Sequence, residues 1–326
     1  MRIRIYFNYY ITYFKFLQVH TRKILGGYMK KTEIFKGVGT ALITPFKDDR
    51  IDFDSLERLI ERQIEGKIDA LVIGGTTAEA ATLSDDERYE LFKVAKSVTR
   101  QRCKLIFGTG TNDTKVAVRH TEFASQLGCD GVLVVTPYYN KGTADGVIRH
   151  YEKIAEVSDA PMLLYNVPSR TGVNLSIDTL KRLSENEKIV GIKEASDSLD
   201  RFMSISRIDG LALYSGNDTQ IYPILSLGGL GVISVVSNLY PKETVDICKY
   251  YFANNTLSSL KIQQELLPVI NSLFLETNPA PIKYALARKG LCTDEMRLPM
   301  WHPCEETKAK IDKAIADYEK IIDALE

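Results

Sequence analysis

Short apolar runs alternate with longer amphipathic stretches along the chain from Gly37 onward. Eight of these runs are nearly continuous in apolar residues, which is typical of parallel strands covered on both faces. They are the segments 38–44, 70–73, 104–108, 131–136, 162–165, 189–193, 211–215 and 231–235. Their starts lie 20 to 34 residues apart, close to the length of a strand plus a crossover helix.

The stretches between the runs have helical periodicity. Leu56, Leu59 and Ile60 fall on one face of a helix, and Ser84 followed by Glu87 forms a capping-box pattern. Eight strand–helix units predict an α/β fold of the (β/α)8 TIM-barrel type. A doubly wound sheet is the alternative, but its first turn should carry G-x-G-x-x-G, and the nearest string, at 108–113, lacks the third glycine.

The pattern changes near the C-terminus. After residue 253 it predicts helices only, over 257–275, 281–289 and 305–325. We therefore expect a barrel catalytic domain over 29–253 and a C-terminal helical segment over 254–326. This segment is expected to pack against the side of the barrel or against a partner subunit.

Residues 1–28 differ in composition from the rest of the chain. They contain five basic residues, no acidic residue and eight of the chain's aromatic side chains. Polar residues interrupt the stretch too often for a transmembrane helix, and no signal-peptide cleavage pattern is present. We interpret it as an upstream extension that results from a misassigned start, with translation expected to begin at Met29. The codons of Gly26-Gly27 can contain a bacterial ribosome-binding sequence just before that methionine. An amphipathic membrane anchor is the alternative.

Composition excludes several classes of protein. Lys+Arg and Asp+Glu are 42 each, so the sequence does not suggest a basic surface for nucleic acid or membranes. The five cysteines are scattered without a C-x-x-C motif. This pattern excludes a disulfide framework and an ordinary zinc module, and it fits a reducing, cytoplasmic location.

One strand-end lysine stands out chemically. Lys193 follows the apolar run 189–192, so a barrel places its amine at the mouth where active sites form. Partial removal from water favours the neutral amine, which can attack a ketone and form a Schiff base. Tyr165, at the end of the preceding strand, could move protons at that centre. The alternatives are a lysine that extends to solvent and a tyrosine in the core or rim.

Three further strand-end residues suit carboxylate groups. Thr76 and Thr77 follow Gly74 and Gly75, and hydroxyls with free N–H groups at such a turn can bind a small carboxylate. Ordinary turn chemistry explains these threonines equally well. Arg170, in a P-S-R-T-G turn, can hold a second carboxylate through two hydrogen bonds, or it is a solvated loop arginine.

The histidines do not indicate a metal site. His20, His120, His150 and His302 lack metal-ligand spacing, and we expect His120 and His150, in predicted helices, to lie on the surface. H-E-x-x-H, P-loop and G-x-S-x-G patterns do not occur. The sequence therefore gives no support to a metalloprotease, a nucleotide triphosphatase or a serine hydrolase.

Taken together, the motifs resemble a known family. The strings G-G-T-T-A-E at 74–79, Y-N-V-P-S-R-T-G at 165–172, S-G-N-D at 215–218 and N-P-A-P-I-K at 278–283 are similar to those of the 4-hydroxy-tetrahydrodipicolinate synthases, pyruvate-dependent class I aldolases. The resemblance runs from about Phe35 to the C-terminus. It implies a lyase that condenses pyruvate with L-aspartate 4-semialdehyde in diaminopimelate and lysine biosynthesis.

The resemblance also assigns roles and partners. It implies no metal or organic cofactor, because the lysine imine is itself the electron sink, and it implies a homotetramer built as a dimer of dimers. The resemblance implies that Lys193 forms the imine and that Tyr165, Thr76 and Tyr139 form the proton relay, with Tyr139 supplied by a neighbouring subunit. It further implies that Thr77 binds the carboxylate of pyruvate and Arg170 that of the semialdehyde. Gly216 and Ile233 are implied to line the pocket.

The chain departs from the family pattern in places. Ala78 and Asn217 replace a usual glycine and a usual aspartate. At positions where lysine-inhibited relatives carry histidines and a glutamate, this chain has Asp85, Arg88 and Val116. Because the ammonium group of lysine would meet Arg88, we expect weak or absent inhibition by lysine.

Two alternatives share part of the pattern. N-acetylneuraminate lyases and 2-keto-3-deoxy sugar acid aldolases have the same lysine and tyrosine, but their polyol substrates offer no second carboxylate for Arg170. A catalytically silent barrel that serves as a binding subunit is the other alternative.

Overall fold

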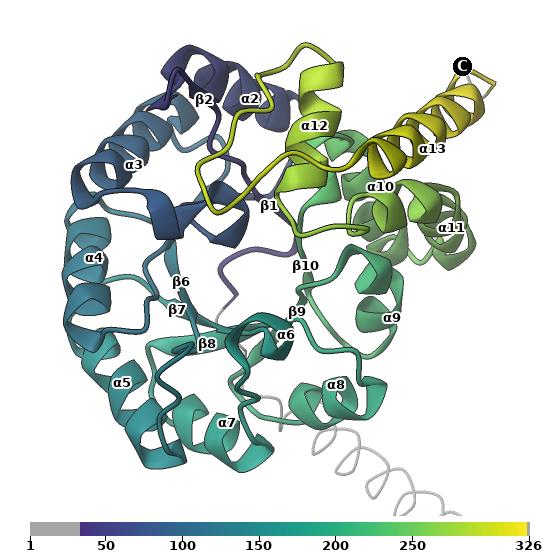
Figure 1. Cartoon of the computed structure of the whole chain (residues 1–326). Helices are drawn as coiled ribbons and strands as arrows, with labels where there is room; N and C mark the ends of the chain where they lie inside the picture. Colours follow the sequence, from purple (N-terminus) through teal and green to yellow (C-terminus); the bar gives the residue numbers. More distant parts are fainter. Residues whose placement is uncertain (1–32, 325–326) are drawn as a thin grey trace, which may run out of the picture.

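The computed structural model describes residues 33–324 and contains a closed barrel of eight parallel strands (Figure 1). Around the barrel the order is β1-β10-β9-β8-β7-β6-β5-β4. The strands are β1 (Gly37–Ala41), β4 (Ala70–Ile73), β5 (Lys104–Gly108), β6 (Gly131–Val135), β7 (Met162–Asn166), β8 (Ile189–Glu194), β9 (Ala212–Ser215) and β10 (Gly231–Ser234). The predicted (β/α)8 TIM barrel is confirmed.

A ring of helices surrounds the strands (Figure 1). It consists of α2 (Phe53–Glu65), α3 (Asp85–Thr99), α4 (Thr114–Gln126), α5 (Ala144–Glu156), α7 (Ile177–Ser184), α8 (Leu199–Ser206), α9 (Ile221–Ser226) and α10 (Pro241–Phe252). The capping box predicted at the start of α3 is present: the Ser84 hydroxyl accepts from the Glu87 backbone N–H, and the Glu87 side chain accepts from the Ser84 N–H. These bonds satisfy free donors at the helix start.

Some elements depart from the predicted pattern. The first strand ends at Ala41 rather than Thr44. The chain then forms a small hairpin of β2 (Phe46–Lys47) and β3 (Arg50–Ile51) that the apolar pattern does not reveal. A one-turn helix, α6 (Pro168–Thr171), and a 3-10 turn, η1 (Thr76–Ala78), also follow strand ends. All of these lie on the carboxyl side of the barrel strands.

Alternate strand residues build two apolar clusters. The outer cluster packs strands against helices, and the inner one fills the barrel. Phe35 closes the amino end, where its ring stacks on Tyr214 at 4.5 Å and its carbonyl accepts a 2.6 Å bond from the Tyr214 hydroxyl. Among the described residues, the barrel is therefore a packed core, and its cavity lies at the carboxyl ends of the strands.

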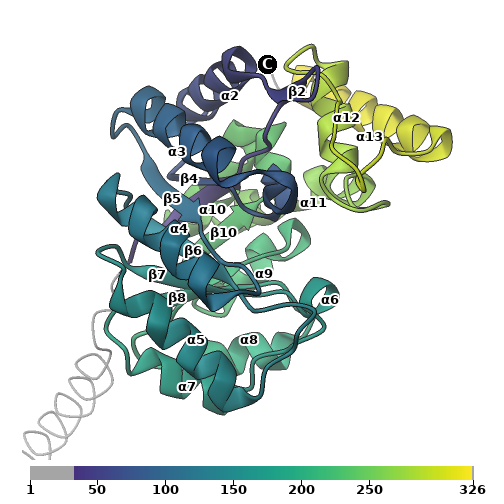
Figure 2. The ribbon, with the colours of Figure 1, turned by 60° about the vertical axis from the view of Figure 1, so that its left-hand side comes forward.

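Three helices follow the barrel, α11 (Thr256–Ser272), α12 (Ala280–Arg288) and α13 (Glu305–Asp323). They lie together on one side in the turned view (Figure 2). The segments on either side of α12 border the barrel mouth through Asn278, Pro279, Pro299 and Met300. Between residues 33 and 324, no helix combines the length and apolarity needed to cross a membrane. The predicted extension over 1–28 lies outside the described residues.

Candidate active site

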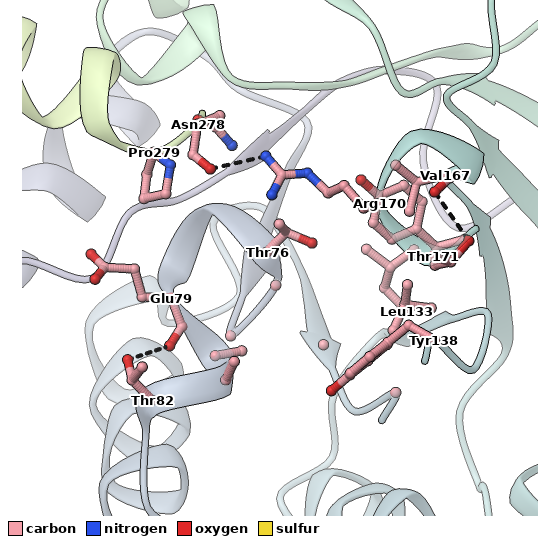
Figure 3. Close-up of a pocket in the computed structure, with 18 of the residues that line it drawn as sticks. Thr76, Glu79, Thr82, Leu133, Tyr138, Val167, Arg170, Thr171, Asn278 and Pro279 are labelled. Carbon is pink, nitrogen blue, oxygen red and sulfur yellow. Dashed lines mark hydrogen bonds between the residues drawn. The ribbon is translucent and has the colours of Figure 1, made fainter. Parts of the chain in front are cut away.

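A cavity of about 300 Å³ opens at the carboxyl ends of β4 to β7. Its border includes Tyr165 together with Thr76, Tyr138, Arg170 and Asn278, which Figure 3 labels. Three of these residues were expected from the sequence. The location agrees with the rule that (β/α)8 enzymes build their sites at this end of the barrel.

Lys193 lies in the barrel wall beside Tyr165. Ile192 belongs to the outer cluster, so its successor Lys193 faces the interior. The side chain is 5% exposed, and its Nζ lies 4.4 Å from the centroid of the Tyr165 ring. The two residues are direct partners in the ladder between β7 and β8. The strand register therefore brings the predicted amine and the predicted phenol together.

The end of β8 is held by a buried carboxylate. Glu194 is fully buried and accepts from Asn166 Nδ2 at 2.8 Å, from the Ser196 N–H at 3.0 Å and from Arg201 Nε at 2.9 Å. A carboxylate with these donors is fixed in place. Because Glu194 adjoins Lys193, the backbone that carries the amine is fixed as well.

The turn after β4 presents hydrogen-bond donors. In the described part of the chain, the backbone N–H groups of Thr76 and Thr77 form no hydrogen bond, so they are available to an anion. The left-handed residues of this turn are Gly74, with φ of 71°, and Glu79, with φ of 55°; Ala78 lies in the 3-10 turn and is not left-handed. Alanine at position 78 therefore needs no unusual backbone conformation.

Arg170 lies across the cavity from this turn (Figure 3). It is part of α6 and exposed. Its Nη2 donates a 2.9 Å hydrogen bond to the Asn278 carbonyl, which leaves the other guanidinium donors available. A guanidinium at the mouth can bind a carboxylate that enters from solvent.

Tyr139 is not brought to the cavity within one chain. Its side chain is 90% exposed and its φ is 69°, a left-handed conformation that is uncommon for an aromatic residue. Its neighbour Tyr138 borders the cavity instead. No hydrogen bond joins Thr76 to Tyr165 or to Tyr139 in the part of the chain that the structure describes.

Gly216 and Ile233 lie on the far side of Lys193; Gly216 directly follows β9, and Ile233 belongs to β10. A side chain at Gly216 would place its Cβ 2.6 Å from the Ala195 Cβ, so glycine is required for the close approach of β9 to β8. Ile233 is fully buried in the inner cluster. Like Lys193 and Thr77, these two residues are not among those that line the cavity.

The sequence reasoning missed the contribution of the C-terminal segment. Asn278 Nδ2 donates to Thr77 Oγ1 at 3.0 Å. Lys283 on α12 forms a fully buried ion pair with Glu79, with 2.5 Å between Nζ and Oε1. Burial lowers the pKa of Lys283, and the carboxylate of Glu79 opposes that effect. The N-P-A-P-I-K string was noticed as a motif, but no role followed from it.

The expectation that His120 and His150 lie on the surface is wrong. They are 2% and 5% exposed. His120 Nε2 lies 2.9 Å from Asp85 Oδ1, and His150 Nδ1 lies 2.9 Å from Thr114 Oγ1. Each ring is bonded through one nitrogen only, because His120 Nδ1 and His150 Nε2 are buried without a hydrogen-bond partner among the described residues. Burial lowers the pKa of each, that of His150 to about 4.

Comparison with known proteins agrees with this geometry. The model of the dihydrodipicolinate synthetase family matches residues 34–318. A 4-hydroxy-tetrahydrodipicolinate synthase of Clostridium novyi (strain NT) is 45% identical over 289 residues, 88% of this chain and 98% of that protein.

Solved structures give the same result. Dihydrodipicolinate synthase of Thermotoga maritima superposes with a TM-score of 0.86 at 39% identity, covering 88% of this chain and 99% of the other. The enzyme of Cyanidioschyzon merolae, solved with lysine bound, has a TM-score of 0.85 at 37% identity, with 88% and 99% covered. The chain belongs to the dihydrodipicolinate synthetase family.

Proposed function

We propose that the protein is a lyase that condenses pyruvate with L-aspartate 4-semialdehyde to give 4-hydroxy-tetrahydrodipicolinate, in the biosynthesis of diaminopimelate and lysine. Membership of the family supports this reaction. The observation that carries it is the buried amine of Lys193, which lies 4.4 Å from the Tyr165 ring at the end of the barrel that holds the cavity.

In the first step, the neutral amine of Lys193 attacks the keto carbon of pyruvate, and loss of water gives a protonated imine. The imine acidifies the adjacent methyl group, so a proton leaves and an enamine forms. The enamine carbon then attacks the aldehyde. Because the imine accepts the electrons, the proposed reaction needs no metal or organic cofactor.

Each of these steps moves a proton. Tyr165 is the proposed shuttle next to the imine, with Thr76 at the cavity border as the second relay group. The third, Tyr139, would come from a neighbouring subunit, because its side chain projects 90% exposed from its own chain. This arrangement requires a dimer, and we propose a homotetramer formed from two such dimers.

Two sites would bind the carboxylates. The free N–H groups and hydroxyl of the Thr76–Thr77 turn suit the carboxylate of pyruvate, and Arg170 at the mouth suits that of the semialdehyde. Gly216 and Ile233 would shape the wall on the other side of Lys193. The five cysteines are free thiols, which is compatible with a cytoplasmic enzyme.

A comparison of substrates tests the proposal. The purified protein should condense pyruvate with L-aspartate 4-semialdehyde and should not cleave N-acetylneuraminate or 2-keto-3-deoxy sugar acids at a comparable kcat/KM. Arg170 favours the first outcome, since a polyol has no second carboxylate to pair with it. Faster cleavage of a sugar acid would identify a related aldolase, and no turnover of any of these would identify a silent barrel.

A further inference from the structure

A single residue of the C-terminal segment contacts both candidate carboxylate sites. Asn278 donates from its side-chain Nδ2 to Thr77 Oγ1 at 3.0 Å, and its backbone carbonyl accepts from Arg170 Nη2 at 2.9 Å. Figure 3 shows the contact with Arg170 at the border of the cavity. Asn278 is 5% exposed; its contact with Thr77 is buried, whereas its contact with the exposed Arg170 is partly buried.

The contact between Asn278 and Thr77 determines where the hydroxyl proton of Thr77 can point. A threonine hydroxyl donates one hydrogen bond and can accept two, whereas the NH₂ group of an asparagine only donates. Thr77 Oγ1 is therefore the acceptor in this bond, and its own proton is left for another group. In the described residues, Thr77 Oγ1 has no second partner, so this proton is available to a ligand oxygen.

We propose that Asn278 is a positioning residue that presents the Thr77 hydroxyl as a hydrogen-bond donor to the carboxylate of the keto acid substrate. This inference rests on the proposed function, because it assumes that a keto acid binds beside Lys193. Without Asn278, the hydroxyl would rotate freely, and its donor would be aligned with the carboxylate for only part of the time.

The fold holds both ends of this contact. Glu79, two residues beyond Thr77, forms the buried ion pair with Lys283, five residues beyond Asn278. Glu79 Oε2 also accepts from the backbone N–H of Arg297 at 3.1 Å. The turn after β4 and the start of α12 are therefore tied together, and Asn278 is anchored opposite Thr77.

The geometry separates the effects on the two substrates. The side chain of Asn278 acts on Thr77, whereas Arg170 contacts only its backbone carbonyl. Replacing the side chain should therefore weaken keto acid binding and leave the binding of the second substrate almost unchanged. A merely structural role would affect both substrates, or the stability alone.

The test measures borohydride trapping of pyruvate on Lys193 as a function of pyruvate concentration. For Asn278→Ala we expect the half-saturating concentration to rise about three- to tenfold, the effect of losing one hydrogen bond. The maximal trapped fraction and the KM for the semialdehyde should stay within about twofold of wild type, which is less than the change expected for pyruvate binding. For Asn278→Asp, Thr77 must donate to the new carboxylate, so the rise should exceed that of Asn278→Ala.

Two comparisons complete the experiment. Asn271→Ala, the same change at an exposed position of α11, should leave the half-saturating concentration unaltered. Thr77→Val removes the hydroxyl itself, so adding Asn278→Ala to it should cause no further loss. Thermal melting establishes whether each variant is folded. If Asn278→Ala is not folded, the same comparison is made with Asn278→Asp, alone and combined with Thr77→Val.

The proposal is overturned if the folded Asn278 variants match wild type, if both substrates weaken equally, or if the losses from Asn278 and Thr77 add. Failure of the proposed function gives a different result, because wild type itself would then trap no pyruvate. The two ideas can therefore fail separately.

Discussion

Lys193 and Tyr165 occupy paired positions on adjacent parallel strands, and this pairing fixes their distance more firmly than loop residues could be fixed. The buried side chain of Glu194 accepts three hydrogen bonds, which hold the end of β8 in place. The proximity of the Lys193 amine to the Tyr165 ring is thus a property of strand register.

Tyr165→Phe removes the hydroxyl and keeps the ring beside Lys193. We expect kcat for the condensation to fall by about 10²- to 10⁴-fold, the usual contribution of a positioned acid–base group, with the thermal stability almost unchanged. Steady-state kinetics and melting curves measure both. Tyr250→Phe on α10, away from the cavity, is the matched control, and equal activity of the two variants would rule out Tyr165 as a proton shuttle.

Lys283→Ala leaves the carboxylate of Glu79 buried without its partner. We expect the free energy of unfolding to fall by about 3–5 kcal/mol, as is typical when one member of a buried pair is removed. Lys313→Ala at a position whose side chain is 81% exposed should change it by less than about 0.5 kcal/mol. Urea unfolding measures the free energy of unfolding of both variants. Similar decreases in the two would show that the buried pair of Lys283 and Glu79 has no larger effect on stability than an exposed lysine.

At the scale of elements, the eight barrel strands were predictable because their apolar runs are nearly continuous and recur every 20 to 34 residues. The hairpin of β2 and β3 was not, since two-residue strands with polar side chains such as Lys47 and Arg50 leave no pattern. The burial of His120 and His150 was missed for a different reason. A helix facing two neighbours buries positions outside its main apolar stripe.

The start of α3 contains an ion pair that predicts a pH dependence. Hydrogen bonds from Arg297 lower the pKa of Glu87 from 4.5 to about 2. Because this pKa is depressed in the folded state, its stabilisation is present above pH 4.5 and is lost as the pH falls toward 2.

Glu87→Gln should therefore lower the free energy of unfolding at pH 6 and have a smaller effect near pH 3. We expect a difference of only about 1 kcal/mol, because Glu87 is partly exposed and screened by solvent. Urea titrations of wild type and variant at the two pH values measure it. A loss that is the same at both would show that the charge of Glu87 is not involved.

At the scale of the whole molecule, the C-terminal segment completes the mouth of the barrel. Asn278 and Thr77 are 201 positions apart in the chain, and nothing in the local pattern of either segment indicates that they meet. The strand-end residues Thr76, Tyr165, Lys193 and Arg170 could be located from sequence because barrel topology gathers strand ends. The contribution of a segment outside that repeat required the structure.

The structure also bears on regulation by lysine. The guanidinium of Arg88 is buried and donates to the carbonyl oxygens of Gly108 at 3.1 Å and Ala80 at 2.7 Å. This fixed positive charge disfavours a ligand ammonium nearby. We therefore expect condensation to proceed at nearly full rate with lysine at the concentration of the substrates, and half-inhibition by submillimolar lysine would contradict this expectation.

The central claim is that Lys193 bonds covalently to a keto acid. Incubation with pyruvate and borohydride, followed by mass spectrometry of the intact protein and its peptides, tests it directly. We predict the addition of one reduced pyruvate per chain, located on Lys193, and no addition to Lys193→Ala, while the exposed-site variant Lys181→Ala behaves as wild type. Equal modification of the Lys193→Ala variant, or an adduct on another lysine, would contradict the account.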